Sequence, residues 1–149
     1  MNNIRITKQF RFEMAHALEG YDGACKHIHG HSYELFVTVI GKPIMDPKSP
    51  KQGMVMDFGD LKKIVQSQII EPLDHALVIN ENSTLDKTLL SHDMFSKIVY
   101  VDYQPTSEIM LLDFVTRIRK RLPEDVKLHS MLFRETASSY AEWYAEDNE

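Results

Sequence analysis

Residues 4–17, with the sequence IRITKQFRFEMAHA, decide how the fold begins, because apolar and polar side chains alternate along them. Successive side chains of a β-strand point to opposite faces, so this period of two predicts one long strand from Ile4 to Ala17. Ser32 to Ile40 alternates in the same way, with one apolar face formed by Tyr33, Leu35, Val37 and Val39. We expect the two strands to pair antiparallel and the loop between them to carry functional residues.

Downstream of this pair, the sequence predicts two amphipathic helices. The first follows Asp57, a favourable helix N-cap, and is bounded by Pro72. The second opens at Pro105 and is bounded by Pro123. Further strands are expected over 98–101, 126–135 and 139–144, and a short one is compatible with 54–56. Residues 80–97 show no regular pattern.

This order of elements predicts the α+β class, with a mainly antiparallel four-stranded sheet and two helices on one of its faces. We expect residues 1–149 to form one domain, because a chain of this length is typical of a single hydrophobic core. The sheet face without helices still carries apolar side chains. That face therefore predicts that copies of the chain associate into a homo-oligomer.

Composition narrows the class of protein further. The net charge of −5 argues against general binding to nucleic acid or to an anionic membrane surface. No apolar run approaches the roughly 20 residues that span a bilayer, and residues 1–12 lack the apolar region of a signal peptide. Cys25 is the one cysteine, so no disulfide can form within the chain. We expect a soluble, cytoplasmic protein.

Three of the seven histidines lie in the stretch HIHGH, residues 27–31. His29 and His31 are two residues apart at the start of a predicted strand, so their side chains point to the same side. His16, near the end of the preceding strand, can join them if the strands pair. Three imidazoles without a fourth protein ligand are typical of an open, catalytic Zn²⁺ site, although copper, nickel and iron accept the same ligands. The alternative is that these are ordinary surface histidines.

Four other residues, at three places in the chain, are candidates for catalysis or binding. Cys25 precedes His29 by four residues and is either a fourth ligand of a closed site or a base beside an open one; the spacing does not decide. Asp74 and His75 are adjacent, so the carboxylate can orient the imidazole as a proton shuttle, or the pair can simply form a turn. Glu135 ends a strand and can bind an amidine-like N–H edge, or remain an exposed charge.

An ordered set of short motifs resembles the family of 6-pyruvoyl-tetrahydropterin synthase and 6-carboxy-tetrahydropterin synthase. The motifs cover nearly the whole chain and appear in the family's order. They are FEMAH at 12–16, CKHIHGHSY at 25–33, MDF at 56–58, LDH at 73–75, PTSE at 105–108 and ET at 135–136.

The resemblance implies a role for each matching residue. His16, His29 and His31 would hold Zn²⁺, and Cys25 would abstract protons with Asp74 and His75 as its relay partners. Glu135 would anchor the pterin ring, with Thr106 and Glu108 also binding substrate. The resemblance also implies the tunnelling fold, in which subunits join their sheets into a barrel and form a hexamer with active sites between subunits.

The spacing Cys-x₃-His-x-His looks like the carboxy-tetrahydropterin branch, which feeds queuosine and other deazapurines. This branch implies conversion of 7,8-dihydroneopterin triphosphate to 6-carboxy-5,6,7,8-tetrahydropterin, acetaldehyde and triphosphate. The long stretch over 80–102 departs from the shortest members and leaves substrate choice open. The alternatives are a 6-pyruvoyl-tetrahydropterin synthase, a zinc hydrolase and a non-enzymatic module with a closed zinc site.

Overall fold

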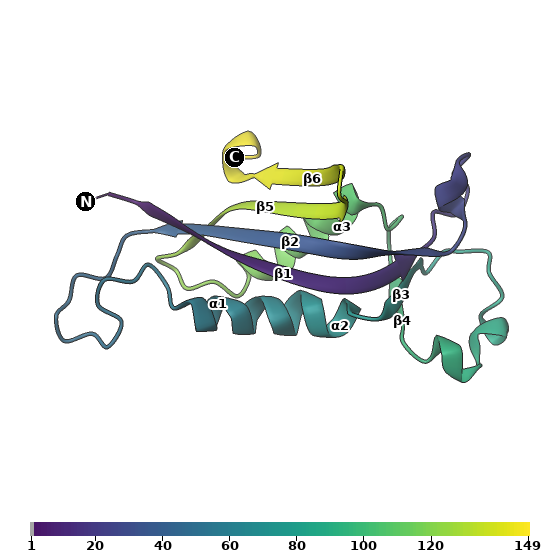
Figure 1. Cartoon of the computed structure of the whole chain (residues 1–149), viewed down its shortest axis with the longest axis horizontal. Helices are drawn as coiled ribbons and strands as arrows, with labels where there is room; N and C mark the ends of the chain where they lie inside the picture. The colour runs from purple at the N-terminus through teal and green to yellow at the C-terminus, as the bar shows by residue number, and fades with distance from the viewer. Residues whose placement is uncertain (1) are drawn as a thin grey trace.

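A curled six-stranded sheet forms the body of the molecule, with the long helices packed on one of its faces (Figure 1). The computed structural model describes residues 2–149. The order of strands across the sheet is β4-β3-β1-β2-β5-β6. The two long central strands therefore lie side by side in the middle, and the short strands lie toward the edges.

The two alternating stretches form the central pair, as the sequence predicted. β1 (Ile4–His16) and β2 (His29–Gly41) are antiparallel from the pair Ile4↔Gly41 to the pair His16↔His29. β5 (Lys127–Thr136) pairs with β2, and β6 (Ser139–Tyr144) pairs with β5, both antiparallel. These strands confirm the antiparallel part of the prediction and place the ends of β1, β2 and β5 close together.

The sheet has six strands rather than the predicted four, and it is mixed, although three of its five strand pairs are antiparallel as predicted. β3 (Ala76–Asn80) runs parallel to β1, and β4 (Ile98–Val101) runs parallel to β3. The sequence did not reveal β3 because it is short and buries Val78 and Ile79 side by side, so it has no alternation. Residues 54–56 are not a strand.

Both predicted helices are confirmed. α1 (Phe58–Val65) begins where the Asp57 carboxylate accepts a hydrogen bond from the Gly59 N–H at 2.6 Å. It continues through a π-helical turn, η2 (Gln66–Ile70), into α2 (Glu71–Leu73). α3 (Ser107–Arg119) begins with the Thr106 hydroxyl accepting from the Ile109 N–H at 3.3 Å. Side-chain caps of this kind contribute about 1 kcal/mol each.

The core lies between the helices and the face of the sheet that they cover. Tyr33, Phe12 and Phe133 stack on one another, with the Tyr33 ring centroid 5.5 Å from Phe12 and 4.7 Å from Phe133, and Phe114 of α3 meets Phe133 edge-on at 5.1 Å. The opposite face carries the ion pairs of Glu34 with two arginines, Arg11 and Arg134. That face is more polar than the sequence pattern suggested, with only half-buried apolar side chains such as Phe36 and Leu132.

Two connections meet at one end of the molecule (Figure 1). The β1–β2 loop contains the short helical turn η1 (Ala24–Lys26), and the β3–β4 connection contains η3 (Lys87–Leu90) and η4 (Asp93–Phe95). A last turn, η5 (Ala145–Asp147), follows β6. Within residues 2–149, no helix is both long and apolar enough to cross a membrane.

Candidate metal centre and adjoining cavity

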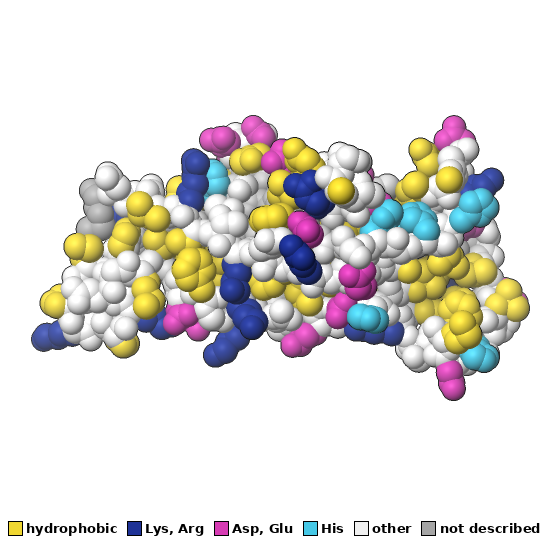
Figure 2. Space-filling view, viewed as in Figure 1, with side chains coloured by type: hydrophobic (Ala, Val, Ile, Leu, Met, Phe, Trp, Pro, Cys, Tyr) yellow, Lys and Arg dark blue, Asp and Glu magenta, His cyan; other side chains and the backbone are white. Residues whose placement is uncertain are grey.

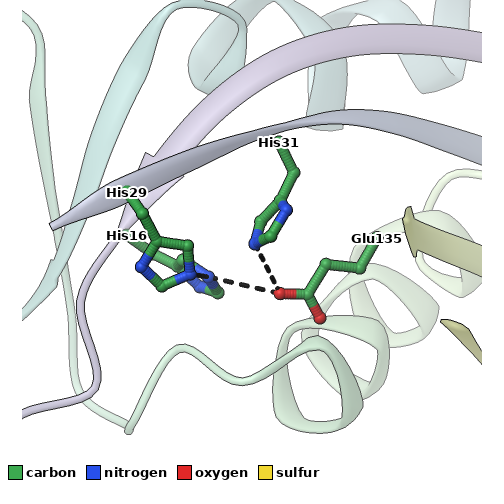
Figure 3. Close-up of side chains that lie close together, drawn as sticks. All are labelled: His16, His29, His31 and Glu135. Carbon is green, nitrogen blue, oxygen red and sulfur yellow. Dashed lines mark hydrogen bonds and ion pairs between the residues drawn. The ribbon is translucent and has the colours of Figure 1, made fainter. Parts of the chain in front are cut away.

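The three histidines predicted as metal ligands converge in space. His16 ends β1 and pairs with His29 at the start of β2, and His31 follows two residues later on the same side of the sheet. The Nε2 atoms of His16 and His29 lie 3.1 Å apart, and the His31 ring centroid is 5.4 Å from that of His16. Figure 3 shows the three rings directed toward a common point. Two-residue strand spacing and antiparallel pairing produce this convergence.

Two backbone carbonyls fix the orientation of the rings. His16 Nδ1 lies 2.7 Å from the carbonyl oxygen of Pro105, and His29 Nδ1 lies 2.6 Å from that of His27. Because a carbonyl only accepts hydrogen bonds, each Nδ1 carries a proton and each Nε2 faces the cluster. In a neutral ring held this way, Nε2 offers its lone pair to a metal ion.

Glu135 joins the cluster from the end of β5. Its Oε1 lies 2.7 Å from His31 Nε2 and 3.4 Å from His16 Nε2, while the Ser107 hydroxyl donates to Oε2 at 2.6 Å (Figure 3). The shorter contact is an ion-pair distance without hydrogen-bond geometry. Hydrogen bonding from His16 outweighs the desolvation of the carboxyl group and, with Ser107 and the nearby His31, lowers the pKa of Glu135 to about 2. The group therefore stays ionised.

The four side chains fit a divalent transition metal. One ligand atom from each of His16, His29, His31 and Glu135 lies within 4.8 Å of every other, so the group could hold one ion. Imidazole nitrogen and carboxylate oxygen are ligands that zinc uses in proteins. Carbonyl groups that hold the far nitrogen of a ligating ring are also typical of such centres. His16 is buried, and burial lowers the pKa of His31, which favours the neutral, ligating form of that ring.

Sequence reasoning did not place Glu135 in this cluster. The residue lies on a strand more than a hundred positions along the chain from His31, and its approach depends on the pairing of β5 with β2. The alternating pattern identified a strand over these residues but not its neighbour in the sheet. A single carboxylate at a strand end gives no signal of its own for metal contact.

A cavity of about 490 Å³ adjoins the cluster. The structure brings four predicted site residues to its wall together with the ligand His16: Cys25, Thr106, Glu108 and Glu135. Cys25 is half-buried in the β1–β2 loop, and Glu108 is exposed in the first turn of α3. Figure 2 shows most of the histidines on the visible face toward the end of the molecule that carries this loop.

Asp74 and His75 do not share this cavity. Asp74 Oδ1 lies 3.0 Å from His75 Nδ1 and accepts a hydrogen bond from the Glu13 N–H at 3.0 Å. The backbone N–H of His75 donates to the Glu13 carbonyl at 2.6 Å. The backbone of His75 has a φ of +62°, a conformation that is uncommon outside glycine. The His75 side chain is 76% exposed and lines a different cavity, which His31 also borders. His75 therefore lines a different cavity from the one that Cys25 of its own chain lines.

The fold and the cluster together define an α+β protein with three histidines and one glutamate that could hold a metal ion, beside a cavity of about 490 Å³. The sequence profile described as 6-pyruvoyl tetrahydropterin synthase matches residues 5–146. The chain belongs to this family, as the motif resemblance predicted.

Individual relatives agree with this assignment. A Haemophilus influenzae protein named 6-carboxy-5,6,7,8-tetrahydropterin synthase is 36% identical over 143 residues, 94% of this chain and 98% of that protein. A Pyrococcus furiosus protein named dihydroneopterin monophosphate aldolase is 35% identical over 124 residues, covering 83% and 82%. The crystal structure of 6-pyruvoyl tetrahydropterin synthase from Plasmodium vivax has a TM-score of 0.71 at 18% identity, covering 96% and 98%. The likeness to this last structure shows the fold.

Proposed function

We propose that this chain is a zinc-dependent 6-carboxy-5,6,7,8-tetrahydropterin synthase acting on 7,8-dihydroneopterin triphosphate. The observation that carries the proposal is the opening of the histidine–glutamate cluster onto a cavity that also contains Cys25. The name and the 36% identity of the Haemophilus influenzae relative support this product over others. Queuosine and related deazapurines would be the pathway served.

His16, His29 and His31 would hold the zinc ion. When bound there, zinc supplies Lewis-acid polarisation of the hydroxyl and carbonyl oxygens of the substrate side chain. Pro105 and His27 keep the ligand rings in the correct tautomer, so the centre needs no rearrangement to bind the ion. Glu135, ionised and held by Ser107, would offset part of the ion's charge and keep His31 in place.

Cys25 would move the protons of the reaction, because its sulfur is the one thiol in the chain and lies at the cavity wall. The relay pair Asp74–His75 would reach this thiol from a neighbouring subunit, since within one chain it borders a different cavity. A homo-oligomer with active sites between subunits therefore follows from the proposal, and a hexamer is the expected assembly.

Glu108 is the carboxylate best placed to anchor the pterin ring. It lines the cavity at the start of α3, where the helix dipole favours a negative charge. A free carboxylate can accept two parallel N–H bonds from the ring's amidine-like edge. Glu135, by contrast, already uses one oxygen for Ser107 and directs the other at the histidines. We therefore divide the predicted roles, with Glu108 at the ring and Glu135 at the metal.

The chemistry follows from these positions. Proton removal from the substrate side chain by Cys25 allows elimination of triphosphate, and a retro-aldol-type cleavage then releases acetaldehyde with consumption of one water. The protein's contribution is to position the side chain and stabilise the enolate-like charge. Stopping after elimination and rearrangement, without carbon–carbon cleavage, would yield the 6-pyruvoyl product instead.

The test is incubation of the zinc-loaded protein with 7,8-dihydroneopterin triphosphate, with and without a chelator, followed by mass analysis of the products. We expect 6-carboxy-tetrahydropterin and acetaldehyde, and none after zinc removal. A 6-pyruvoyl product would assign the chain to the other branch. A parallel incubation with dihydroneopterin monophosphate tests the aldolase activity named for the Pyrococcus furiosus relative. Cleavage of the monophosphate alone would refute the proposed substrate.

A further inference from the structure

The loop that carries Cys25 is closed near its base by two backbone hydrogen bonds. The Leu18 N–H donates to the Cys25 carbonyl at 3.0 Å, and the Tyr21 N–H donates to the Leu18 carbonyl at 3.1 Å. The position of the cysteine backbone therefore depends on the residues just after His16. Whatever holds residues 18–21 in place also holds the thiol at the cavity.

Glu19 is the residue in this stretch that reaches across to other elements. Both oxygens of its carboxylate accept from the Thr84 N–H at 3.1 Å, and the Thr84 hydroxyl donates to the same carboxylate. The Glu19 backbone carbonyl accepts from the Gln104 side-chain amide at 2.9 Å. Hydrogen bonds from Ser83 and Thr84 hold the pKa of Glu19 below its usual value, so the carboxylate stays ionised at neutral pH.

The turn that Glu19 contacts is itself fixed to the sheet. The Ser83 N–H donates to the Asn80 carbonyl at 3.0 Å, directly after β3, and the Glu81 N–H donates to the Val101 carbonyl of β4 at 2.7 Å. These bonds anchor the turn on two strands. Glu19 thus connects the β1–β2 loop to a turn that is hydrogen-bonded to two strands of the sheet.

Gln104 extends this connection to the metal centre. It precedes Pro105, whose carbonyl oxygen orients His16, and its own carbonyl accepts from the Thr106 N–H at 2.8 Å. The side chain of Glu19 therefore faces the β3–β4 connection, while its backbone is tied to the segment that orients a metal ligand. Both ties lie at the end of the molecule where the two connections meet (Figure 1).

We propose that Glu19 is a positioning residue for Cys25, whose carboxylate uses Thr84 as a fixed anchor to hold the thiol-bearing loop against the cavity. The β3–β4 connection then restrains the loop that carries Cys25. The consequence for catalysis rests on the proposed function. The structural part of the inference, the restraint of residues 18–27 by Glu19, stands independently of the substrate.

The experiment compares the zinc-loaded, full-length wild type with Glu19→Ala and Thr84→Ala. The matched control is Glu124→Ala, which changes an exposed glutamate in the turn between α3 and β5. Two readouts need no substrate: amide hydrogen exchange over residues 18–27, and the rate of iodoacetamide alkylation of Cys25, the one cysteine. Bound zinc is measured in every sample, and kcat and KM are measured with the pterin.

Glu19→Ala should speed exchange over 18–27 and change the alkylation rate by about fivefold or more, because several hydrogen bonds are lost together. Thr84→Ala, which keeps its backbone N–H, should have an intermediate effect, and Glu124→Ala none. kcat should fall in the same order with zinc content unchanged. Unaltered exchange and alkylation in Glu19→Ala overturn the inference, whatever happens to kcat. If wild type does not turn over the pterin, the proposed function fails while these two readouts still decide the role of Glu19.

Discussion

His16 Nδ1 and the carbonyl oxygen of Pro105 lie 2.7 Å apart, which joins the end of β1 to the residue that leads into α3. The contact directs the Nε2 lone pair of His16 at the other two histidines. It also links the start of α3 to the histidine–glutamate cluster, as does the hydrogen bond from Ser107 to Glu135. The orientation of a ligand ring is thus set by a backbone atom 89 positions away along the chain.

Replacing His29 tests the metal centre directly. His29→Ala removes a ligand, so we expect bound zinc to fall from one equivalent to a small fraction after dialysis, measured by elemental analysis. His27→Ala is the control, because it keeps the backbone carbonyl through which His27 contacts the His29 ring. That variant should keep its zinc. Full zinc content in His29→Ala would contradict the assigned ligand set.

Cys25→Ala separates proton transfer from metal binding. Turnover of the pterin should fall by about 10²- to 10⁴-fold, the range typical for a general acid–base group, while zinc content stays unchanged. Cys25→Ser provides a variant of nearly equal volume for comparison. Loss of zinc in Cys25→Ala would show instead that the sulfur is a metal ligand and that the site is closed.

A mixing experiment tests the separation of Cys25 from Asp74 and His75. If one active site combines the thiol of one subunit with the relay pair of another, inactive Cys25→Ala and His75→Ala chains complement each other. Mixed assemblies from equal amounts should regain about a quarter of the wild-type activity, because a quarter of the shared sites contain both native residues. Co-refolded samples showing no recovery would place the complete site within one chain.

Glu108 and Glu135 both line the cavity and should respond differently to neutralisation. Glu108→Gln should raise KM for the pterin roughly 10- to 100-fold with a smaller effect on kcat, since bonds to a charged group contribute about 1.5–3 kcal/mol. Glu135→Gln should lower kcat and weaken zinc binding, because that side chain faces the ligand rings. A rise in KM alone in Glu135→Gln would return the anchoring role to Glu135, as the motif resemblance implied.

The hydrogen bonds to the Asp74 carboxylate should make the stability of the fold depend on pH in the acid range. The Glu13 N–H chiefly, helped by His75 and Lys97, holds the pKa of Asp74 below its ordinary value of 3.8. A carboxyl group with a lowered folded-state pKa contributes stability above its unfolded value and loses it as the pH falls through the folded value. The difference in Tm between wild type and Asp74→Asn should therefore be constant above about pH 5 and shrink below pH 4. A gap that widens on acidification would contradict this reasoning.

Some strands of this chain could be predicted from the sequence, whereas β3 could not. The alternation of residues 4–17 and 32–40 predicted β1 and β2, and the pairing of these strands placed His16 beside His29. These features depend on residues close together in the sequence, so the period and spacing of the side chains are enough to predict them. The β3 strand was missed because it is short and its neighbours in the sheet supply its stability.

The parts of the site that the sequence did not reveal depend on contacts between distant segments. Glu135 reaches the histidines through the β2–β5 pairing, and the Pro105 and His27 carbonyls act through backbone atoms, which leave no trace in residue type. The separation of Asp74 and His75 from Cys25 also follows from the path of the chain around the sheet. The family resemblance named these residues, whereas only the three-dimensional arrangement shows which of them meet.

The cluster draws its members from β1, β2 and β5, so a bound ion would fasten together segments that enclose most of the polypeptide. Contacts of such large sequence separation form late, because the entropy of closing the intervening loop is lost before the contact can compensate for it. An ion could bind all four side chains only after β1, β2 and β5 have paired, so metal binding would follow the formation of this part of the sheet. Because the Pro105 and His27 carbonyls already orient the His16 and His29 rings, the folded chain would bind the ion without first turning them.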